Sequence, residues 1–349
     1  MVNVRSTPLD STTEQISSDD RRVEQFGDEN RLLSADREND AVEPASPIKN
    51  KQNIIWIASY PKSGNTWVRV FVHNLLRELR GETQGSQDIN DLGRYAIWEH
   101  SYPHYTQILG KAPTRATAEE MAKARPAAQA LISRQQQGLS LTKTHLCFGT
   151  DHGTPTINLD VTLAAIYIVR NPLDVAISYA HHCSRSIDAI IADMAQPGFR
   201  TLPTEKHVGE ILGSWSQNVA SWMGVASRPV HIMRYEDMLD YPERMFSGLA
   251  AFLGLRPTKK QLESAIEKSS FAELAKQETE RGFKEKPKQA ERFFRQGRAG
   301  QWQDLLSENQ VQRVLSSSAP IMQRVGYLPP RGVGSIKYSL PSKEGNNGQ

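Results

Sequence analysis

Cysteine is scarce in this chain of 349 residues, which contains only Cys147 and Cys183. Two cysteines do not make a disulfide framework, so the composition is typical of a reducing compartment and predicts a cytoplasmic location. Long apolar runs are also lacking, since none approaches the roughly 20 residues that cross a bilayer. The N-terminus has no hydrophobic signal segment and is too acidic for a transit peptide. We therefore expect no transmembrane segment.

Large apolar side chains are rare near both ends of the chain. Residues 1–50 hold eleven acidic and six basic side chains, so residues 51–349 carry a net charge of +8 within the total of +3. We predict a disordered acidic extension over residues 1–50, one catalytic domain over 51–327 and a flexible tail over 328–349. The basic domain suits an anionic ligand, and a solvated basic surface is the alternative explanation.

The most informative stretch is residues 54–79, IIWIASYPKSGNTWVRVFVHNLLREL. Its apolar start predicts a strand buried on both faces, and the later apolar residues recur at helical spacing up to a stop near Gly81. Between them lies a polar turn, Ser59–Thr66. Successive backbone N–H groups at the start of a helix, together with a lysine, favour binding of phosphate or sulfate.

This turn differs from the loop of nucleoside triphosphatases. That loop reads GxxxxGK[ST], with lysine at the start of the helix and a hydroxyl residue behind it to hold magnesium. Here Lys62 precedes Ser63 and Gly64, and no GxxxxGK[ST] occurs in the chain. The lysine is therefore expected beside the end of a phosphate chain from which a group leaves, and no metal is expected.

A second strand is predicted at residues 139–146, LSLTKTHL. Lys143 and His145 are two residues apart and therefore project to the same face. An imidazole can take a proton from a hydroxyl at neutral pH, and a neighbouring ammonium can stabilise charge on a transferred group. Taken alone, a histidine at a strand end is more often structural, and Cys147 is interpreted as structural.

A third apolar strand, residues 163–169, is followed by Arg170 and a helix start. Asn171 fits an N-cap, Pro172 the first helical position and Asp174 a capping-box acid. Ser178 lies eight residues after Arg170, whose alternative role is a salt bridge at the strand end. The contiguous residues 181–183, HHC, fan apart on a helix, so they are interpreted as packing and rim residues and not as metal ligands.

The remaining chain predicts a strand at residues 230–234 and a charged lid candidate at residues 280–287. Residues 98–105 form an aromatic and histidine cluster without helical or strand period, and we expect them and residues 187–207 to wall an acceptor pocket. Tyr235-Glu236-Asp237 is expected to cap the following helix. Further helices are predicted near residues 116–134, 213–223, 242–253, 259–267 and 271–277.

Four segments resemble, in the same order, the cytosolic-type family of sulfotransferases that use 3′-phosphoadenosine 5′-phosphosulfate (PAPS), with a bacterial-type member as the expected relative. They are PKSGNTW, KTH, VRNPLDVAISY and FRQGRAGQW, which span residues 54–302. The resemblance implies that the 5′-phosphosulfate is bound by Lys62, Ser63, Gly64, Asn65, Thr66 and Trp67. It implies that the 3′-phosphate is bound by Arg170, Ser178, Arg295, Gln296 and Gly297, with Gln296 standing where the family has lysine.

The same resemblance implies that His145 is the catalytic base, that Lys62 and Lys143 stabilise charge, and that Trp67 faces the adenine. The residue that is often an adenine-contacting tyrosine in the family is Leu212 here. The desulfated nucleotide, 3′-phosphoadenosine 5′-phosphate (PAP), would be the product. The family's dimerisation signature is not recognisable, so the oligomeric state stays open.

We therefore predict a three-layer α/β, P-loop-like fold with a mostly parallel central sheet and helices on both faces. The predicted reaction is in-line transfer of a sulfuryl group from PAPS to a hydroxyl, or an amine, of a small-molecule, sugar or lipid acceptor. No nucleic-acid partner is expected. The alternatives are a P-loop kinase that uses ATP and a non-catalytic sensor that binds PAP.

Overall fold

The computed structural model describes residues 52–135 and 138–328. The predictions for residues 1–50, and for the tail beyond Leu328, lie outside the described residues. Within the described residues, no helix is both long enough and apolar enough to cross a membrane.

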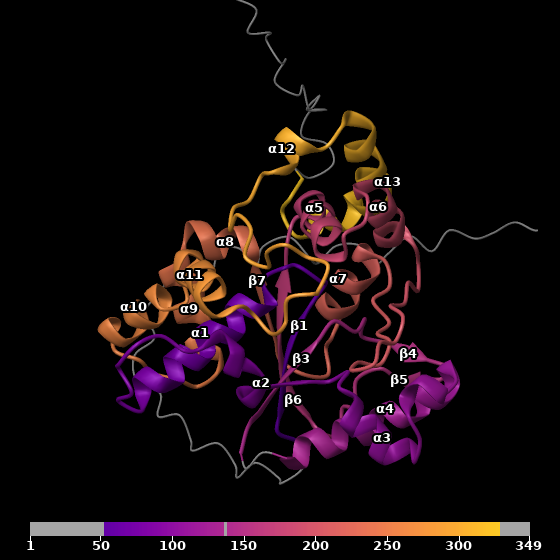
Figure 1. Cartoon of the computed structure of the whole chain (residues 1–349), viewed down its shortest axis with the longest axis horizontal. Helices are drawn as coiled ribbons and strands as arrows, with labels where there is room; N and C mark the ends of the chain where they lie inside the picture. Colours follow the sequence, from indigo (N-terminus) through magenta and orange to yellow (C-terminus); the bar gives the residue numbers. More distant parts are fainter. Residues whose placement is uncertain (1–51, 136–137, 329–349) are drawn as a thin grey trace, which may run out of the picture. The chain divides into compact units, whose positions relative to one another are not determined.

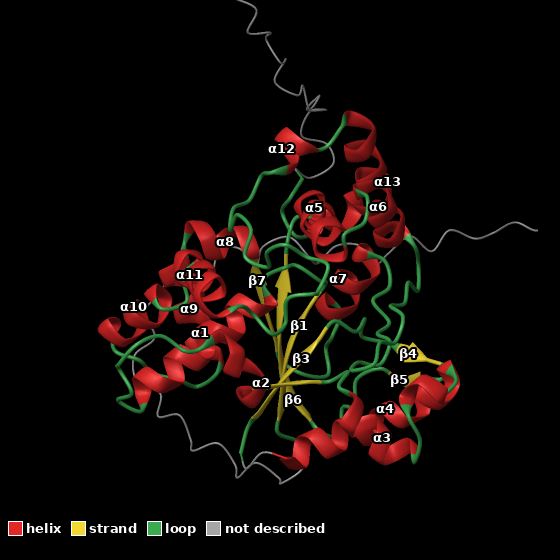
Figure 2. Ribbon diagram, viewed as in Figure 1, coloured by secondary structure: helices red, strands yellow, loops and turns green. Residues whose placement is uncertain are grey.

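A parallel β-sheet forms the centre of the domain (Figure 2). Its five strands are β1 (Ile54–Ser59), β2 (Ala96–Trp98), β3 (Ser140–Thr144), β6 (Thr162–Val169) and β7 (Val230–Arg234). They lie in the order β2-β3-β1-β6-β7, and every pair is parallel. The predicted strands are confirmed. All six residues of β1 are buried, because it is the middle strand of the sheet and is covered on both faces.

Helices cover both faces of the sheet, which confirms the three-layer α/β prediction (Figure 1). Successive side chains of β1 point to opposite faces, so Ile55 and Ile57 join one core while Ile54 and Trp56 join the other. The first core is covered by α1 (Asn65–Leu79), α8 (Tyr235–Asp240), α9 (Pro242–Phe252) and α10 (Lys259–Glu267). The second is covered by α5 (Pro172–Cys183), α6 (Ile187–Ala195), α7 (Trp215–Met223) and α13 (Glu308–Arg324).

The remaining described elements complete the domain. They are η1 (Ile89–Asp91), α2 (Leu92–Tyr95), α3 (Tyr102–Leu109), η2 (Pro113–Arg115), α4 (Ala118–Gln135), β4 (Thr150–Asp151), β5 (Thr154–Pro155), α11 (Phe271–Arg281) and α12 (Trp302–Leu305). The predicted helix at residues 116–134 is confirmed as α4. The interpretation of residues 98–105 as lacking strand and helix is wrong, because Trp98 ends the edge strand β2 and Tyr102 begins α3.

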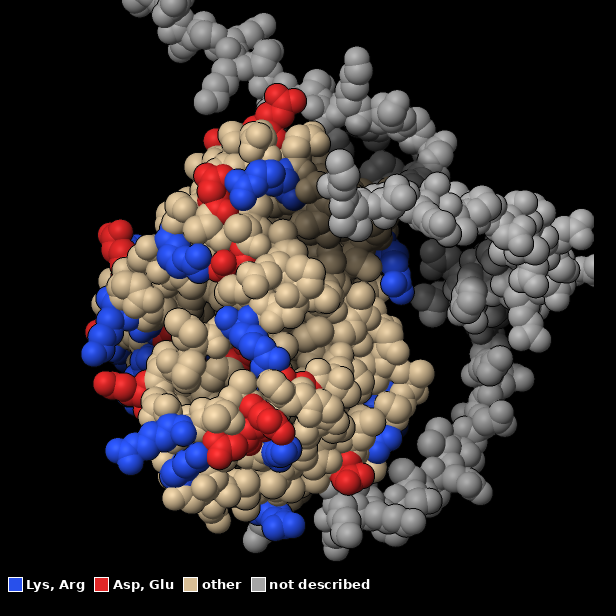
Figure 3. Space-filling model, turned by 90° about the vertical axis from the view of Figure 1, so that its right-hand side faces the viewer, with Lys and Arg blue, Asp and Glu red and all other residues tan. Residues whose placement is uncertain are grey.

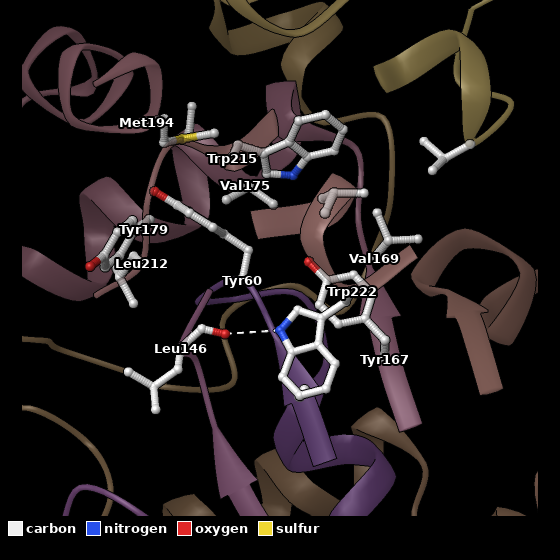
Figure 4. Close-up of a cluster of buried hydrophobic side chains, with 14 of the residues drawn as sticks. Tyr60, Leu146, Tyr167, Val169, Val175, Tyr179, Met194, Leu212, Trp215 and Trp222 are labelled. Atoms are coloured by element: carbon white, nitrogen blue, oxygen red, sulfur yellow. Dashed lines mark hydrogen bonds between the residues drawn. The ribbon is translucent and has the colours of Figure 1, made fainter. Parts of the chain in front are cut away.

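The core between the sheet and α5 to α7 anchors the chain just after β3 (Figure 4). Trp215 and Trp222 of α7 are fully buried there. The indole of Trp222 donates a hydrogen bond of 2.9 Å to the carbonyl of Leu146. Because buried tryptophans usually pair their N–H, this bond fixes the segment that immediately follows His145.

Charged side chains of both signs are interspersed on the face of the domain shown in Figure 3. The surplus of basic residues predicted for the domain therefore does not gather into one basic patch on that face. The cationic groups that matter for an anionic ligand are instead buried at the end of the sheet.

Candidate active site

A cavity of about 1110 Å³ opens at the carboxyl ends of β1, β3 and β6. This is where parallel α/β sheets bind ligands, because the loops after adjacent strands converge there. The cavity brings together twelve of the thirteen site residues predicted from the sequence: Lys62, Gly64, Asn65, Thr66, Trp67, Lys143, His145, Arg170, Ser178, Arg295, Gln296 and Gly297. Ser63 does not line it; its hydroxyl is buried without a hydrogen-bond partner among the described residues.

The turn after β1 is held in a tight conformation. Lys62 has φ of 65° and Gly64 has φ of 109°, both in the left-handed region. A Cβ at Gly64 would lie 2.9 Å from the ring of Tyr235, so only glycine fits there. The Asn65 side chain donates to the Ile57 carbonyl at 2.8 Å and ties the start of α1 back to the strand. Contacts within the protein therefore fix the conformation of the turn.

Lys62 has little negative charge nearby to balance its ammonium group. Its Nζ lies 3.8 Å from the centre of the Phe293 ring. Burial lowers the pKa of Lys62 to about 7, and the nearby Arg170 and Lys143 add to the effect. A group in this environment gains its proton when an anion arrives, because an opposite charge favours the charged form.

His145 is oriented by the end of β1. Its Nδ1 lies 2.7 Å from the carbonyl oxygen of Ser59, which can only accept, so Nδ1 carries the hydrogen and donates it. The Nε2 atom consequently holds a free lone pair. Burial, followed by the charge of Lys143, lowers the pKa of His145 to about 3, so the imidazole is neutral at pH 7. A neutral imidazole with a free lone pair is able to accept a proton.

Lys143 belongs to a buried charge network that sequence reasoning missed. Its Nζ lies 3.9 Å from the Trp98 ring centre and 3.9 Å from a carboxylate oxygen of Glu285. Glu285 in turn accepts two hydrogen bonds, of 2.7 and 2.5 Å, from the guanidinium of Arg69. Burial lowers the pKa of Lys143 to about 8, and Glu285 opposes that shift.

Glu285 lies in the charged segment that was predicted to be a lid, and Arg69 anchors it to α1. The sequence did contain a signal for this contact. Arg69 falls between Val68 and Val70, which are both fully buried, and an arginine at such a position requires a carboxylate partner.

Arg170 joins the first loop to the closing segment of residues 294–302. Its guanidinium donates to the Lys62 carbonyl and to the Arg298 carbonyl, each at 3.1 Å. It also lies 4.2 Å from the centre of the Tyr235 ring. Ser178 lies in α5, eight residues after Arg170; it is half-buried and lines the same cavity. Arg170 therefore bonds to backbone carbonyls and does not form, with any described residue, the strand-end salt bridge that was its alternative role.

Asp174 holds the closing segment, which corrects its predicted role as a capping acid. Asn171 alone caps α5, accepting from the Leu173 N–H at 3.0 Å. The buried carboxylate of Asp174 instead accepts from the backbone N–H groups of Gly300 at 2.7 Å and Trp302 at 3.1 Å.

Gly297 in this closing segment has φ of 60°, and a Cβ there would come within 2.2 Å of the Phe271 ring. Gln296 lies on the surface and accepts a hydrogen bond of 3.0 Å from Arg298. Arg295 donates to the side chain of Gln301. Glycine is therefore required at position 297 for two independent reasons, its backbone angle and the closeness of the ring.

The prediction that residues 235–237 cap the next helix is wrong. These residues begin α8, and Tyr241 precedes α9. Glu236 accepts from the backbone N–H of Asn171 at 3.0 Å and from the Tyr327 hydroxyl at 2.6 Å. Tyr235 lines the cavity, a role that sequence reasoning missed.

An apolar end of the cavity surrounds Trp67, which packs edge to face against Tyr235 with ring centres 5.8 Å apart. Met238, Leu239 and Phe271 also line this end. Leu212 is fully buried in the core behind the sheet and does not line the cavity. The apolar end fits the flat face of a purine base.

Metal ligation has no support in the described residues, where no group of three or more histidine, cysteine or acidic side chains is arranged to hold an ion. Of the contiguous residues 181–183, only His182 lines the cavity. Burial and the charge of Lys62 lower the pKa of His182 to about 2.

Comparison with known proteins gives a consistent result. A family model described as a sulfotransferase domain matches residues 52–326. Sulfotransferase 1A1 of Bos taurus is 29% identical over 240 residues, which cover 68% of this chain and 71% of that protein. Cytosolic sulfotransferase 15 of Arabidopsis thaliana is 26% identical over 285 residues, which cover 76% and 71%.

Among solved structures, retinol dehydratase in complex with androsterone and the inactive cofactor PAP superposes with a TM-score of 0.54. The two chains are 19% identical, and the match covers 78% of this chain and 81% of that one. At this level of identity the likeness shows a shared fold.

Proposed function

This chain belongs to the sulfotransferase family, and from that premise we propose that it moves the sulfuryl group of PAPS onto a hydroxyl of a small-molecule, sugar or lipid acceptor. An amine acceptor is the less favoured variant. The cytosolic relatives also support a cytoplasmic location.

One observation carries the proposal: four groups from three segments far apart in the sequence meet in a single cavity, namely Lys62, Lys143, His145 and Arg170. Two of them, Lys62 and Lys143, have lowered pKa values because they are buried without enough negative charge nearby. A nucleotide that has both a 3′-phosphate and a 5′-phosphosulfate carries several negative charges and supplies what is missing.

We assign the two phosphates of PAPS to different parts of the cavity. The 5′-phosphosulfate is assigned to the preformed turn of residues 62–67, where Lys62 and the N-terminus of α1 favour an anion. The 3′-phosphate is assigned to Arg170, Ser178 and residues 295–297, and the adenine to the apolar end near Trp67. The PAP in the retinol dehydratase complex supports a nucleotide of this kind.

In the proposed mechanism, Nε2 of His145 removes the proton of the acceptor hydroxyl while its oxygen attacks sulfur. The bond between sulfur and the 5′-phosphate oxygen breaks, and PAP leaves with the electron pair. Lys62 and Lys143 stabilise the negative charge on the sulfuryl group and the leaving oxygen. Bound phosphate and sulfate raise the pKa of His145 from its value in the empty site, because opposite charge favours the imidazolium.

The test is transfer of radiolabelled sulfate from PAPS to a panel of phenols, sterols, glycolipids and sugars in excess chelator. His145→Ala and Lys62→Ala should each reduce kcat by about 10²–10⁴-fold, and Arg170→Ala should mainly raise the PAPS concentration required. His181→Ala and Lys259→Ala are the matched controls, since both residues are exposed and outside the cavity.

Two outcomes would contradict the proposal. Tight binding of ATP without binding of PAP, with activity lost in chelator, would favour a kinase. Tight binding of PAP without a single turnover on any acceptor would favour a sensor. Undiminished kcat in His145→Ala would remove the assignment of the base alone.

A further inference from the structure

The cavity has two chemically different ends, with Lys143 and His145 between them. The end assigned to the adenine, around Trp67, is apolar, whereas the opposite end is built from polar and aromatic side chains. Six of the residues at this polar end are Trp98, His100, Thr201, Thr204, His207 and Glu210. The rings of phenols and sterols are mostly apolar and bind best in pockets lined by apolar side chains, so this polar end suits another kind of acceptor.

The polar end is joined directly to the catalytic residues. Glu210 accepts a hydrogen bond of 3.0 Å from the backbone N–H of His145 and lies 3.5 Å from Nδ1 of His100. Trp98 lies under the Lys143 ammonium. A molecule held by these side chains therefore presents its hydroxyl within reach of Nε2 of His145.

Backbone pairing keeps the two walls of the polar end together. The N–H of Val208 donates to the His100 carbonyl at 2.9 Å, and the N–H of Tyr102 donates to the Lys206 carbonyl at 3.1 Å. Ser101 and His207 form an antiparallel bridge between the same two segments. The polar groups are consequently held in place before an acceptor binds, which is what specific recognition requires.

Several hydrogen-bonding groups at this end lack partners. His100 is 6% exposed, and its Nδ1 has no hydrogen-bond partner among the described residues. Glu210 is 7% exposed, and only one of its two carboxylate oxygens is engaged. The hydroxyls of Thr201 and Thr204 accept from backbone N–H groups, which leaves their own hydrogens available to donate.

An aromatic surface accompanies these groups. The rings of Trp98, His100 and His207 contact one another, with centres 4.7 to 5.2 Å apart. Trp98 is half-buried and faces the cavity. The charged side chains of the cavity lining are of both signs: Glu205 is acidic, and Lys206, Lys284, Lys286 and Lys288 are basic. Glu285 also lines the cavity, but its carboxylate is paired with Arg69 and Lys143.

We propose that the acceptor is a carbohydrate, whose ring lies against Trp98 and whose hydroxyls pair with His100, His207 and Glu210. This inference rests on the proposed function. A sugar ring offers C–H groups to the negative face of an indole and several hydroxyls that both donate and accept. A sterol or simple phenol would bury the same polar groups without partners, which disfavours it strongly.

The experiment first separates this inference from the proposed function. Calorimetry with PAP tests nucleotide binding without any acceptor. Radiolabelled PAPS is then offered with an array of mono- and disaccharides, and in parallel with nitrophenol and androsterone. We expect kcat/KM for the best sugar to exceed that for either apolar acceptor by about 100-fold or more, because a site built for hydroxyls rejects analogues that lack them.

A protein that binds PAP and labels phenols or sterols but no carbohydrate overturns the inference and leaves the proposed function standing. If no carbohydrate in the array is labelled, the inference of a carbohydrate acceptor is likewise overturned. A protein that does not bind PAP overturns the proposed function itself.

Two variants test the assigned residues. His207→Phe keeps a ring beside Trp98 but removes the nitrogen atoms, and Glu210→Gln keeps the acceptor for the His145 N–H while removing the charge. Each should lower kcat/KM for the sugar by about tenfold or more with unchanged affinity for PAP. His181→Phe, an exposed histidine outside the cavity, is the matched control. Equal losses with sugar and phenol in His207→Phe would mean a structural role and would refute the assignment.

Discussion

Asp174→Asn should loosen the closing segment without disturbing the rest of the fold. The carboxylate of Asp174 is 1% exposed and accepts from two backbone N–H groups, those of Gly300 at 2.7 Å and Trp302 at 3.1 Å. An asparagine has one acceptor oxygen, so its NH₂ group would face the second N–H. One charge-assisted bond is lost and one buried N–H is left unpaired.

The expected loss in the free energy of unfolding is about 2.5–6 kcal/mol, since the lost charge-assisted bond contributes about 1.5–3 kcal/mol and an orphaned buried N–H costs about 1–3 kcal/mol. The same segment carries Gly297 and receives a hydrogen bond from Arg170 at Arg298. Binding of PAP would have to order it again, so the affinity for PAP should fall by about 10–100-fold, at 1.4 kcal/mol for each factor of ten.

Denaturant unfolding and calorimetry with PAP measure the two effects, and hydrogen exchange at Gly300 and Trp302 locates them. Asp193→Asn is the matched control, because Asp193 pairs only with the partly exposed Arg185 on the surface and should change stability by less than about 1 kcal/mol. An Asp174→Asn protein with wild-type affinity for PAP and unchanged exchange at both amides would refute the reasoning.

Three further outcomes follow from the same geometry. Because burial lowers the pKa of Lys62 to about 7 and a phosphate raises it, PAP binding near pH 8 should take up about one proton and weaken as pH rises above 7, which calorimetry in two buffers measures and Lys62→Met abolishes. NMR of nitrogen-labelled histidine should find His145 neutral at pH 5 with its hydrogen on Nδ1; a charged ring would contradict the lowered pKa, and a neutral ring with its hydrogen on Nε2 would contradict the assigned tautomer. Gly297→Ala should weaken PAP binding more than Gly300→Ala, because both have left-handed φ but only the first meets the Phe271 ring, so equal effects would exclude the steric argument.

Apolar runs, together with the alternation and β-branched residues of 139–146, were sufficient to predict four of the five strands of the central sheet. Buried parallel strands need apolar side chains on both faces, and this requirement is visible in residues 54–58 and 163–169. Strand β2 escaped because its three residues, Ala96–Trp98, are too few to show any alternation. A sequence pattern cannot reveal an edge strand this short, because it is a strand only through its pairing with β3.

The site residues missed by sequence reasoning share a physical cause: their roles come from contacts over long sequence distances. Asp174 resembles a helix-capping acid locally, yet its partners lie more than 120 residues further on. Glu285 is one acid in a charged segment until Arg69 is seen opposite it. Tyr235 was interpreted from its local position at a strand end, and only the packing of Trp67 against it shows which side it faces.

The guanidinium of Arg170 bridges the first loop, at Lys62, to the last segment of the cavity, at Arg298. During synthesis on the ribosome, a nascent chain therefore has no complete nucleotide cradle until the segment ending at Trp302 has emerged from the exit tunnel. Until then the cavity lacks its closing segment, and several cationic side chains lack an anionic partner. The nucleotide can therefore assist only the last stage of folding. Ribosome-bound chains of increasing length should acquire PAP-dependent resistance to proteolysis only beyond this point.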